Sequence, residues 1–327
     1  MSLLDVRDLS IGFHMPGRDV QVVDRVSFSL EQSETLAIVG ESGSGKTQTA
    51  FSLMGLLAKN GYATGSVRFD GQELIGMSEA QLNKVRAEQI AMIFQDPMTS
   101  LNPYIRVGDQ LTEVLMLHKG ANKREATAEA IRMLDAVKLP DARNIFRRFP
   151  HECSGGMRQR IMIAMALLCR PKLLIADEPT TALDVTVQAQ MLELFKSLTD
   201  EFKTALIIIS HDLGVVAGLA DRMLVMYAGR IVESGTVDEL FYDPRHPYTL
   251  GLLDSTPNVE TKAHRLKSIK GSPPNLEHLP DGCVFNPRCP YRFDHCFAER
   301  PQLTPLPGGR EKACFYGAPL VHREAVA

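Results

Sequence analysis

The octapeptide Gly40-Glu41-Ser42-Gly43-Ser44-Gly45-Lys46-Thr47 matches the pattern G-x-x-x-x-G-K-[ST] of a phosphate-binding loop. Before it, residues 35–39 are apolar and β-prone, and after it residues 48–57 carry apolar side chains at helical spacing without proline. A strand, a glycine-rich turn and a helix N-terminus direct several backbone N–H groups at one point, which favours an anion there. A simple glycine-rich connection with a lysine at its edge is the alternative. The flanking segments favour the first interpretation, so we expect the chain to bind a nucleoside triphosphate.

Each residue type in this loop has an expected task. Gly40, Gly43 and Gly45 can take positive φ and bring the backbone close to phosphate oxygens. Lys46 would reach the β- and γ-phosphates as a point charge, and the Thr47 hydroxyl would hold Mg²⁺. The predicted nucleotide-binding residues of the loop are Gly40, Ser42, Gly43, Ser44, Gly45, Lys46 and Thr47.

Length and composition limit the classes of protein that fit. At 327 residues, with 44% hydrophobic and 23% charged residues, the chain has room for one large domain and a smaller appendage. A net charge of −3 argues against a nucleic-acid partner. The most apolar run, residues 161–169, stops at Arg170-Pro171 and is too short to cross a membrane, and no signal peptide is visible. We therefore expect a cytosolic chain that reaches a membrane through partners.

Short apolar segments that end in polar residues follow the loop. Residues 3–30 are predicted to form a hairpin around Pro16-Gly17, and residues 65–71 a second hairpin that ends in an Asp-Gly turn. Phe13 lies on the first hairpin, either as a core aromatic or as a face for a nucleotide base. Three further buried strands are predicted: residues 90–94 before Gln95, 173–176 before Asp177 and Glu178, and 205–209 before Ser210-His211.

These strand ends carry the side chains that hydrolysis of a phosphoanhydride needs. Asp177 would bind Mg²⁺, and Glu178 would orient and deprotonate the attacking water. The Gln95 amide would lie beside Mg²⁺ and that water, and His211 would face the γ-phosphate. A solvated acidic turn and a structural histidine are the alternatives, which the upstream phosphate loop disfavours.

Between these strands the pattern becomes helical. Residues 107–149 show apolar side chains at helical spacing with charged faces between them, which predicts an inserted helical subdomain over about residues 97–160. Near its end, Ser154-Gly155-Gly156 precedes an apolar helix and forms a second candidate anion site. As an isolated tripeptide it would be an ordinary helix cap.

Taken in order, these elements resemble the nucleotide-binding subunit of an ABC transporter over about residues 3–243. The resemblance implies an α/β P-loop ATPase with a mixed sheet, an inserted helical subdomain and a small Cys-rich C-terminal extension. It also implies a role for each candidate residue. Phe13 would stack on the base, Gln95 would be the Q-loop glutamine, and Ser154, Gly155 and Gly156 would form the signature. Asp177 would be the Walker B aspartate, Glu178 the catalytic glutamate, Asp184 the D-loop aspartate and His211 the switch histidine. Cys153 and Met157 depart from the family's Leu-Ser-Gly-Gly-Gln at its outer positions, and we expect a working signature with altered flanking contacts.

The chain is also similar to the oligopeptide and dipeptide permease ATPases, at residues 92–103, at residues 245–249 and in the cysteine-bearing tail. This resemblance implies ATP hydrolysis that energises peptide uptake, at the cytoplasmic face of a bacterial inner membrane. It implies a heterodimer with a paralogous ATPase, two membrane permease subunits docked near residues 98–117, and an external peptide-binding protein. In the family each ATP lies between one subunit's phosphate loop and its partner's signature. Alternatives are another solute such as nickel, a soluble ABC ATPase acting on DNA or ribosomes, and a binding module without turnover.

The extension, predicted as residues 244–327, is rich in Pro and Gly and contains four of the six cysteines: Cys283, Cys289, Cys296 and Cys314. In a reduced cytosol these are free thiols or metal ligands. Four thiolates suit Zn²⁺ or an iron–sulfur cluster. The spacing lacks paired C-x2-C knuckles, and the resemblance implies a four-iron cluster here, so [4Fe–4S] is favoured over zinc, as a structural staple. Cys153 and Cys169 are expected to pack in the core.

Overall fold

The computed structural model of the chain describes residues 2–95, 100–180, 185–255 and 268–320. Contacts divide the chain into a first unit of Met1–Leu30, Thr35–Ile75 and Ile209–Ala327, and a second unit of Glu31–Glu34 and Gly76–Ile208. The boundary expected near residue 243 does not separate these units, because the C-terminal extension packs within the first. That boundary stays a prediction about domain organisation.

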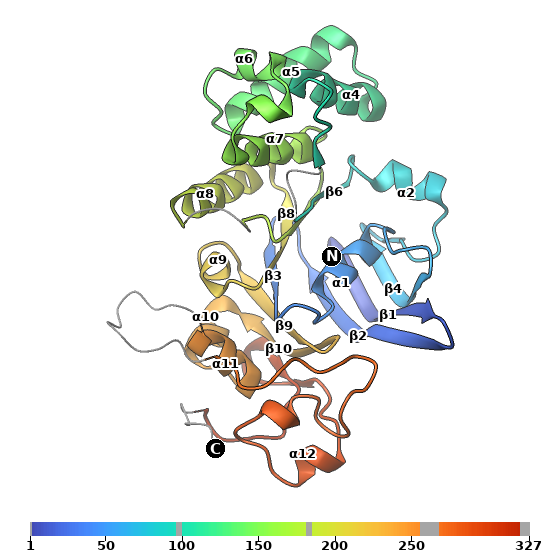
Figure 1. The fold of residues 1–327 in the computed structure, drawn as a ribbon, viewed down its shortest axis with the longest axis vertical. Coiled ribbons are helices and arrows are strands. Elements are labelled where there is room, and N and C mark those ends of the chain that lie inside the picture. Colours follow the sequence, from blue (N-terminus) through green and yellow to red (C-terminus); the bar gives the residue numbers. More distant parts are fainter. Residues whose placement is uncertain (1, 96–99, 181–184, 256–267, 321–327) are drawn as a thin grey trace. The chain divides into compact units, whose positions relative to one another are not determined.

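An antiparallel sheet forms the N-terminal part of the first unit (Figure 1). Its strands, in the order β2-β1-β4-β5, are β1 (Leu4–Met15), β2 (Arg18–Leu30), β4 (Gly61–Phe69) and β5 (Gln72–Glu73). The β4–β5 turn has Asp70 at φ 49° and Gly71 at φ 79°, the two positive values that a tight two-residue hairpin requires. Both hairpins predicted from the sequence are therefore confirmed.

The remaining strands of the first unit pair with one another in both parallel and antiparallel orientation. Their order is β11-β12-β10-β9-β3, with β3 (Thr35–Val39), β9 (Arg222–Tyr227), β10 (Arg230–Thr236), β11 (Thr304–Pro305) and β12 (Glu311–Lys312). β3 pairs with β9 in parallel, and β10 pairs with β9 and β12 in antiparallel orientation. Every residue of β3 is buried, as a continuous apolar run predicts.

Short helices connect and follow these strands. They are α1 (Lys46–Leu53), α9 (Leu213–Ala217), α10 (Val237–Tyr242), α11 (Pro247–Ser255), α12 (His295–Ala298) and the 3₁₀ turns η2 (Asn286–Arg288) and η3 (Pro307–Gly309). The helix predicted through residue 57 ends at Leu53, because Gly55 takes a left-handed φ of 62°. No helix within the described part of the chain combines the length and apolar character needed to cross a membrane.

The second unit combines three strands, of which β6 and β7 pair in parallel, with a helical cluster. Its strands, in the order β8-β7-β6, are β6 (Ile90–Ile93), β7 (Leu173–Asp177) and β8 (Ala205–Ser210), the last belonging to this unit up to Ile208. All residues of β7 and β8 are buried, so the strands predicted at these positions are confirmed. In the sequence, helix α2 (Glu79–Val85) precedes β6, and helix α8 (Val185–Phe202) lies between β7 and β8.

The inserted helical region is also present in the second unit. It consists of α4 (Val107–Lys119), α5 (Lys123–Ala136), α6 (Ala142–Arg147), the 3₁₀ turn η1 (Pro150–Glu152) and α7 (Gly155–Leu167). Helices α4 to α7 pack on one another (Figure 1). Gly120 ends α4 at φ 62°, and a capping box of Asn122 and Glu125 starts α5, so local sequence sets these boundaries.

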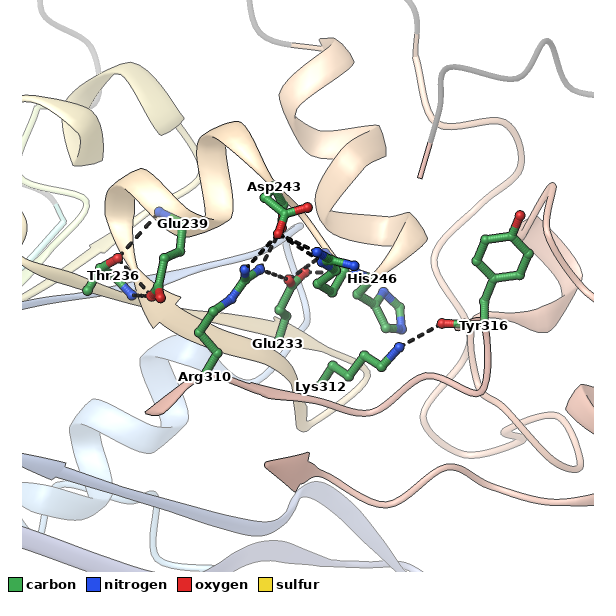
Figure 2. A network of polar contacts seen from close by, with 9 residues as sticks. Glu233, Thr236, Glu239, Asp243, His246, Arg310, Lys312 and Tyr316 are labelled. Carbon is green, nitrogen blue, oxygen red and sulfur yellow. Dashed lines mark hydrogen bonds and ion pairs between the residues drawn. The ribbon is translucent and has the colours of Figure 1, made fainter. Parts of the chain in front are cut away.

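A buried polar network joins the C-terminal extension to β10 in the first unit (Figure 2). The fully buried Glu233 carboxylate accepts the backbone N–H groups of Arg245 at 2.6 Å and His246 at 3.0 Å. Arg310, just before β12, donates to Glu233 Oε1 at 3.4 Å and to Asp243 Oδ2 at 3.1 Å. Burial lowers the pKa of His246 to about 3, so its ring is neutral at pH 7 and Arg310 provides the positive charge to Glu233.

Candidate functional site

The phosphate loop has the glycine geometry that its sequence predicts. Gly40, Gly43 and Gly45 have φ of 152°, 80° and 100°. A Cβ at Gly40 would lie 2.2 Å from the carbonyl oxygen of Met226, so a larger residue there would displace the backbone. The loop joins β3 to α1, whose N-terminus has no side-chain cap and no acidic residue in its first turn. Its backbone N–H groups are thus placed to receive an anion.

Two polar side chains inside the loop fit an anionic ligand. Lys46 is 5% exposed, and its ammonium donates to the carbonyl oxygens of Gly40 at 2.7 Å and Glu41 at 2.9 Å. The buried Ser44 hydroxyl has no hydrogen-bond partner among the residues that the structure describes. A phosphate oxygen would give the buried hydroxyl a hydrogen-bond partner. It would also give the ammonium a charged acceptor, which bonds more strongly than a neutral carbonyl oxygen.

The first unit also holds Phe13 and His211. Phe13 lies in β1 opposite Val20 of β2 and Gly61 of β4, and its side chain is half-buried. Part of the residue is therefore accessible, although its base-stacking role stays a prediction. His211 directly follows β8 and is exposed.

The second unit brings two predicted catalytic residues into contact. Asp177 is the last residue of β7 and is 3% exposed, and Glu178 follows it at φ 46°. The Gln95 amide, which lies beyond the end of β6, donates to Glu178 Oε2 at 2.9 Å. A non-glycine residue in the left-handed region costs on the order of 1–3 kcal/mol and is typical of functional positions. Neither this strain nor the direct Gln95–Glu178 bond was predicted from the sequence.

The signature tripeptide lies at the start of α7, as predicted. The Ser154 side chain caps the helix by accepting the Met157 N–H at 3.3 Å. A Cβ added to Gly155 would meet nothing within 4 Å, so a ligand or partner has open space to approach this helix end. The anion-binding role of Ser154, Gly155 and Gly156 stays a prediction. Asp184 lies outside the described residues.

The four cysteines of the extension lie in one region. The Cys283 N–H donates to the Cys296 carbonyl oxygen at 2.8 Å, and the rings of Tyr291 and Tyr316 lie 4.9 Å apart, beside Cys289 and Cys314 respectively. Burial, with a smaller contribution from the other three thiols, raises the pKa of Cys289 to about 12. All are free thiols.

No group of three or more His, Cys, Asp or Glu side chains within residues 2–95, 100–180, 185–255 and 268–320 is arranged as a ready metal site. The clustering of the thiols is compatible with the expected cluster, but their side-chain arrangement gives it no direct support. Cys153 and Cys169 are 3% and 2% exposed, and burial raises the pKa of both, which confirms their packing in the core.

Two family models match the chain. One describes ABC transporters and matches residues 23–181, and the other describes the C-terminal region of oligopeptide/dipeptide transporters and matches residues 232–296. The chain is 60% identical over 313 residues to the oligopeptide transport ATP-binding protein OppD of Salmonella typhimurium, covering 96% of this chain and 93% of that protein. The chain belongs to the oligopeptide transport family of ABC transporter ATP-binding proteins. The predicted family and ATP-binding function are thereby confirmed.

Two further comparisons agree with this family. The OppD protein of Escherichia coli K12 is 60% identical over 314 residues, covering 96% of this chain and 93% of that protein. A dimeric, post-hydrolysis ATP-binding cassette bound to ADP and Pi has a TM-score of 0.64 at 24% identity, covering 72% of this chain and 98% of that one. The latter supports the ABC cassette fold predicted from the sequence.

Sequence reasoning missed the residues that hold the phosphate loop from outside. Glu41, a variable position of the loop pattern, bonds through its carboxylate to Arg288 and through its N–H to Tyr248. Arg288 is next to a cysteine but matches no motif. A glutamate in the loop gave no signal of a partner so distant in the chain.

Proposed function

We propose that this chain is the ATP-hydrolysing subunit of a bacterial ABC importer that takes up oligopeptides. The observation that carries the proposal is 60% identity to OppD proteins over 96% of the chain. The phosphate-loop geometry supports ATP as the nucleotide, since the loop offers glycine backbone, Lys46 and a helix N-terminus to the phosphates. The C-terminal region model supports peptides rather than nickel as the solute.

Each predicted site residue has a proposed part in the chemistry of hydrolysis. Thr47 and Asp177 would hold Mg²⁺, which when bound neutralises charge on the β- and γ-phosphates. Glu178 accepts the proton of the attacking water while Gln95 orients that water and the carboxylate. His211 would stabilise charge on the γ-phosphate oxygens, and the α7 N-terminus at Ser154 would do the same for the ATP held by the phosphate loop of the second subunit.

Partners are required because one chain carries one phosphate loop and one signature. We infer a second, paralogous ATPase subunit, two membrane permease subunits and, indirectly, an external peptide-binding protein. Tyr104, Met116 and Leu117 are 89%, 46% and 74% exposed, and the latter two line a groove on α4. This apolar surface supports docking of the permease subunits, which would hold the chain at the cytoplasmic face of the inner membrane.

Reconstitution tests this function. The chain, its second ATPase and both permease subunits are placed in proteoliposomes with the peptide-binding protein, and uptake of a radiolabelled tripeptide is followed. We expect uptake that depends on MgATP and falls to background in a Lys46→Ala complex, because the ammonium that reaches the phosphates is gone. Uptake of nickel without uptake of peptide would show that the solute is nickel and not a peptide. ATP turnover without any transport would contradict the importer.

We also propose that Cys283, Cys289, Cys296 and Cys314 hold a [4Fe–4S] cluster, with Zn²⁺ as the alternative. The donor set supports it, since four thiols gather in one small extension. The Tyr291 N–H donates to Cys289 Sγ at 3.4 Å, and such bonds stabilise ligating sulfurs. The cluster would act as a structural staple.

Metal analysis of anaerobically purified protein decides this proposal. We expect about four irons and four sulfides per chain, lost in a Cys289→Ser variant because a thiolate ligand is missing. A Cys169→Ser variant is the control, as that thiol packs in the core of the other unit. One zinc without iron would make the extension a zinc staple, and neither metal would leave four free thiols.

A further inference from the structure

A partly buried ion pair connects the phosphate loop to the C-terminal extension within the first unit. The Arg288 guanidinium donates to both carboxylate oxygens of Glu41, at 2.6 and 2.9 Å. The side chain of Arg288 is 5% exposed and that of Glu41 is 25% exposed. A bidentate arginine–carboxylate pair fixes both the distance and the orientation of its two partners.

The extension holds Arg288 rigidly from its other side. Its Nε donates to the Lys270 carbonyl oxygen at 3.1 Å, and Nη2 donates to the Ile269 carbonyl oxygen at 3.4 Å. Nη1 also reaches the Tyr227 hydroxyl at 3.3 Å, and the guanidinium lies over that ring, 5.8 Å from its centre. A guanidinium stays protonated at physiological pH, so the positive charge opposite Glu41 is permanent. These contacts hold the Arg288 side chain in one position, unlike that of a mobile surface arginine.

The phosphate loop is held at the same residue from two more directions. The Glu41 N–H donates to the hydroxyl of Tyr248, a fully buried residue of α11, at 2.7 Å. The Glu41 carbonyl oxygen accepts from the Lys46 ammonium at 2.9 Å. Because Lys46 must reach phosphates, the placement of Glu41 also sets the starting position of the ammonium.

Arg288 lies next to the cysteine-bearing segment in the sequence. It is the last residue of η2 and immediately precedes Cys289. Residues 273–276 of the extension and residues 41–44 of the phosphate loop line the same cavity of about 260 Å³. The extension thus borders the loop along most of its first half.

We propose that Arg288 is a positioning residue through which the C-terminal extension holds the phosphate loop in its nucleotide-binding conformation. The inference rests on the proposed function, since it assumes that the loop binds MgATP. Loss of the pair frees the first half of the loop and leaves the lysine ammonium displaced from the phosphates. The extension is then part of the ATP site's scaffold as well as an appendage.

Nucleotide affinity of the purified full chain tests the proposal. We expect the Kd for MgATP to rise about tenfold in Arg288→Gln and in Glu41→Gln, a change within the usual range of coupling between sites. The double variant should be no weaker than either single variant, because both remove one interaction. Arg288→Lys should be intermediate, since an ammonium cannot make the bidentate contact. In the assembled complex, KM for ATP should rise while kcat changes little.

Arg292→Gln is the matched control, because that guanidinium bonds to the carbonyl oxygens of Asn286 and Pro287 in the same segment. Thermal unfolding of each variant separates a folding defect from a loop defect. If Arg288→Gln does not fold, Glu41→Gln decides alone, since it leaves the arginine in place. An unchanged Kd in a folded variant would overturn the inference and leave the proposed function intact. A wild-type chain that binds no MgATP would instead overturn the function.

Discussion

Replacing Glu178 with glutamine is expected to lower the ATP turnover of the assembled complex by roughly 100-fold or more, the usual contribution of a general base. An amide cannot accept the proton of the attacking water, yet it keeps the size of the side chain and an oxygen that still accepts from Gln95. MgATP affinity should therefore change little. Phosphate release under saturating ATP measures turnover, and equilibrium binding measures the affinity.

The control for this variant is Glu193→Gln, which removes an exposed carboxylate from α8 of the same unit. It should hydrolyse ATP at the wild-type rate. Turnover in Glu178→Gln equal to wild type would remove the glutamate from the catalytic role. A loss of MgATP binding together with turnover would instead assign Glu178 to nucleotide binding or folding.

The sequence predicted the elements whose pattern is local. β3, β7 and β8 are buried on both faces, so each appears as an uninterrupted apolar run. The glycines of the phosphate loop are similarly readable, since Gly43 and Gly45 must take positive φ wherever the loop occurs. Residues at the ends of such strands, including Asp177 and His211, could be named because catalytic side chains project where strands end.

Contacts between distant segments could not be predicted in the same way. Glu41 and Arg288 are 247 positions apart, and their pairing depends on how the extension packs, which no local pattern encodes. The Gln95–Glu178 bond likewise joins residues 83 positions apart. The metal prediction rested on spacing and resemblance alone, because four cysteines indicate a site without fixing which ion their geometry suits.

Replacing Arg310 with methionine is expected to destabilise the first unit by about 3–5 kcal/mol, the usual cost of removing one partner of a buried ion pair. Glu233 is 0% exposed and burial raises the pKa of its carboxyl, so without Arg310 the carboxylate keeps two backbone N–H donors but loses the positive charge beside it. The same substitution removes the bond to Asp243. Urea unfolding followed by circular dichroism measures the effect. A lower midpoint with a reduced m-value would indicate that the extension unfolds before the rest.

Arg245→Met is the matched control, because Arg245 pairs with the same Asp243 but its side chain is 32% exposed. Such a surface pair contributes about 0–1 kcal/mol, so the control should unfold near the wild-type midpoint. Glu233→Gln combined with Arg310→Met should recover much of the lost stability, since no buried charge is then left unbalanced. Equal midpoints for Arg310→Met and Arg245→Met would contradict the argument. They would mean that the antiparallel pairing of β12 with β10, rather than the ion pair, holds the extension in place.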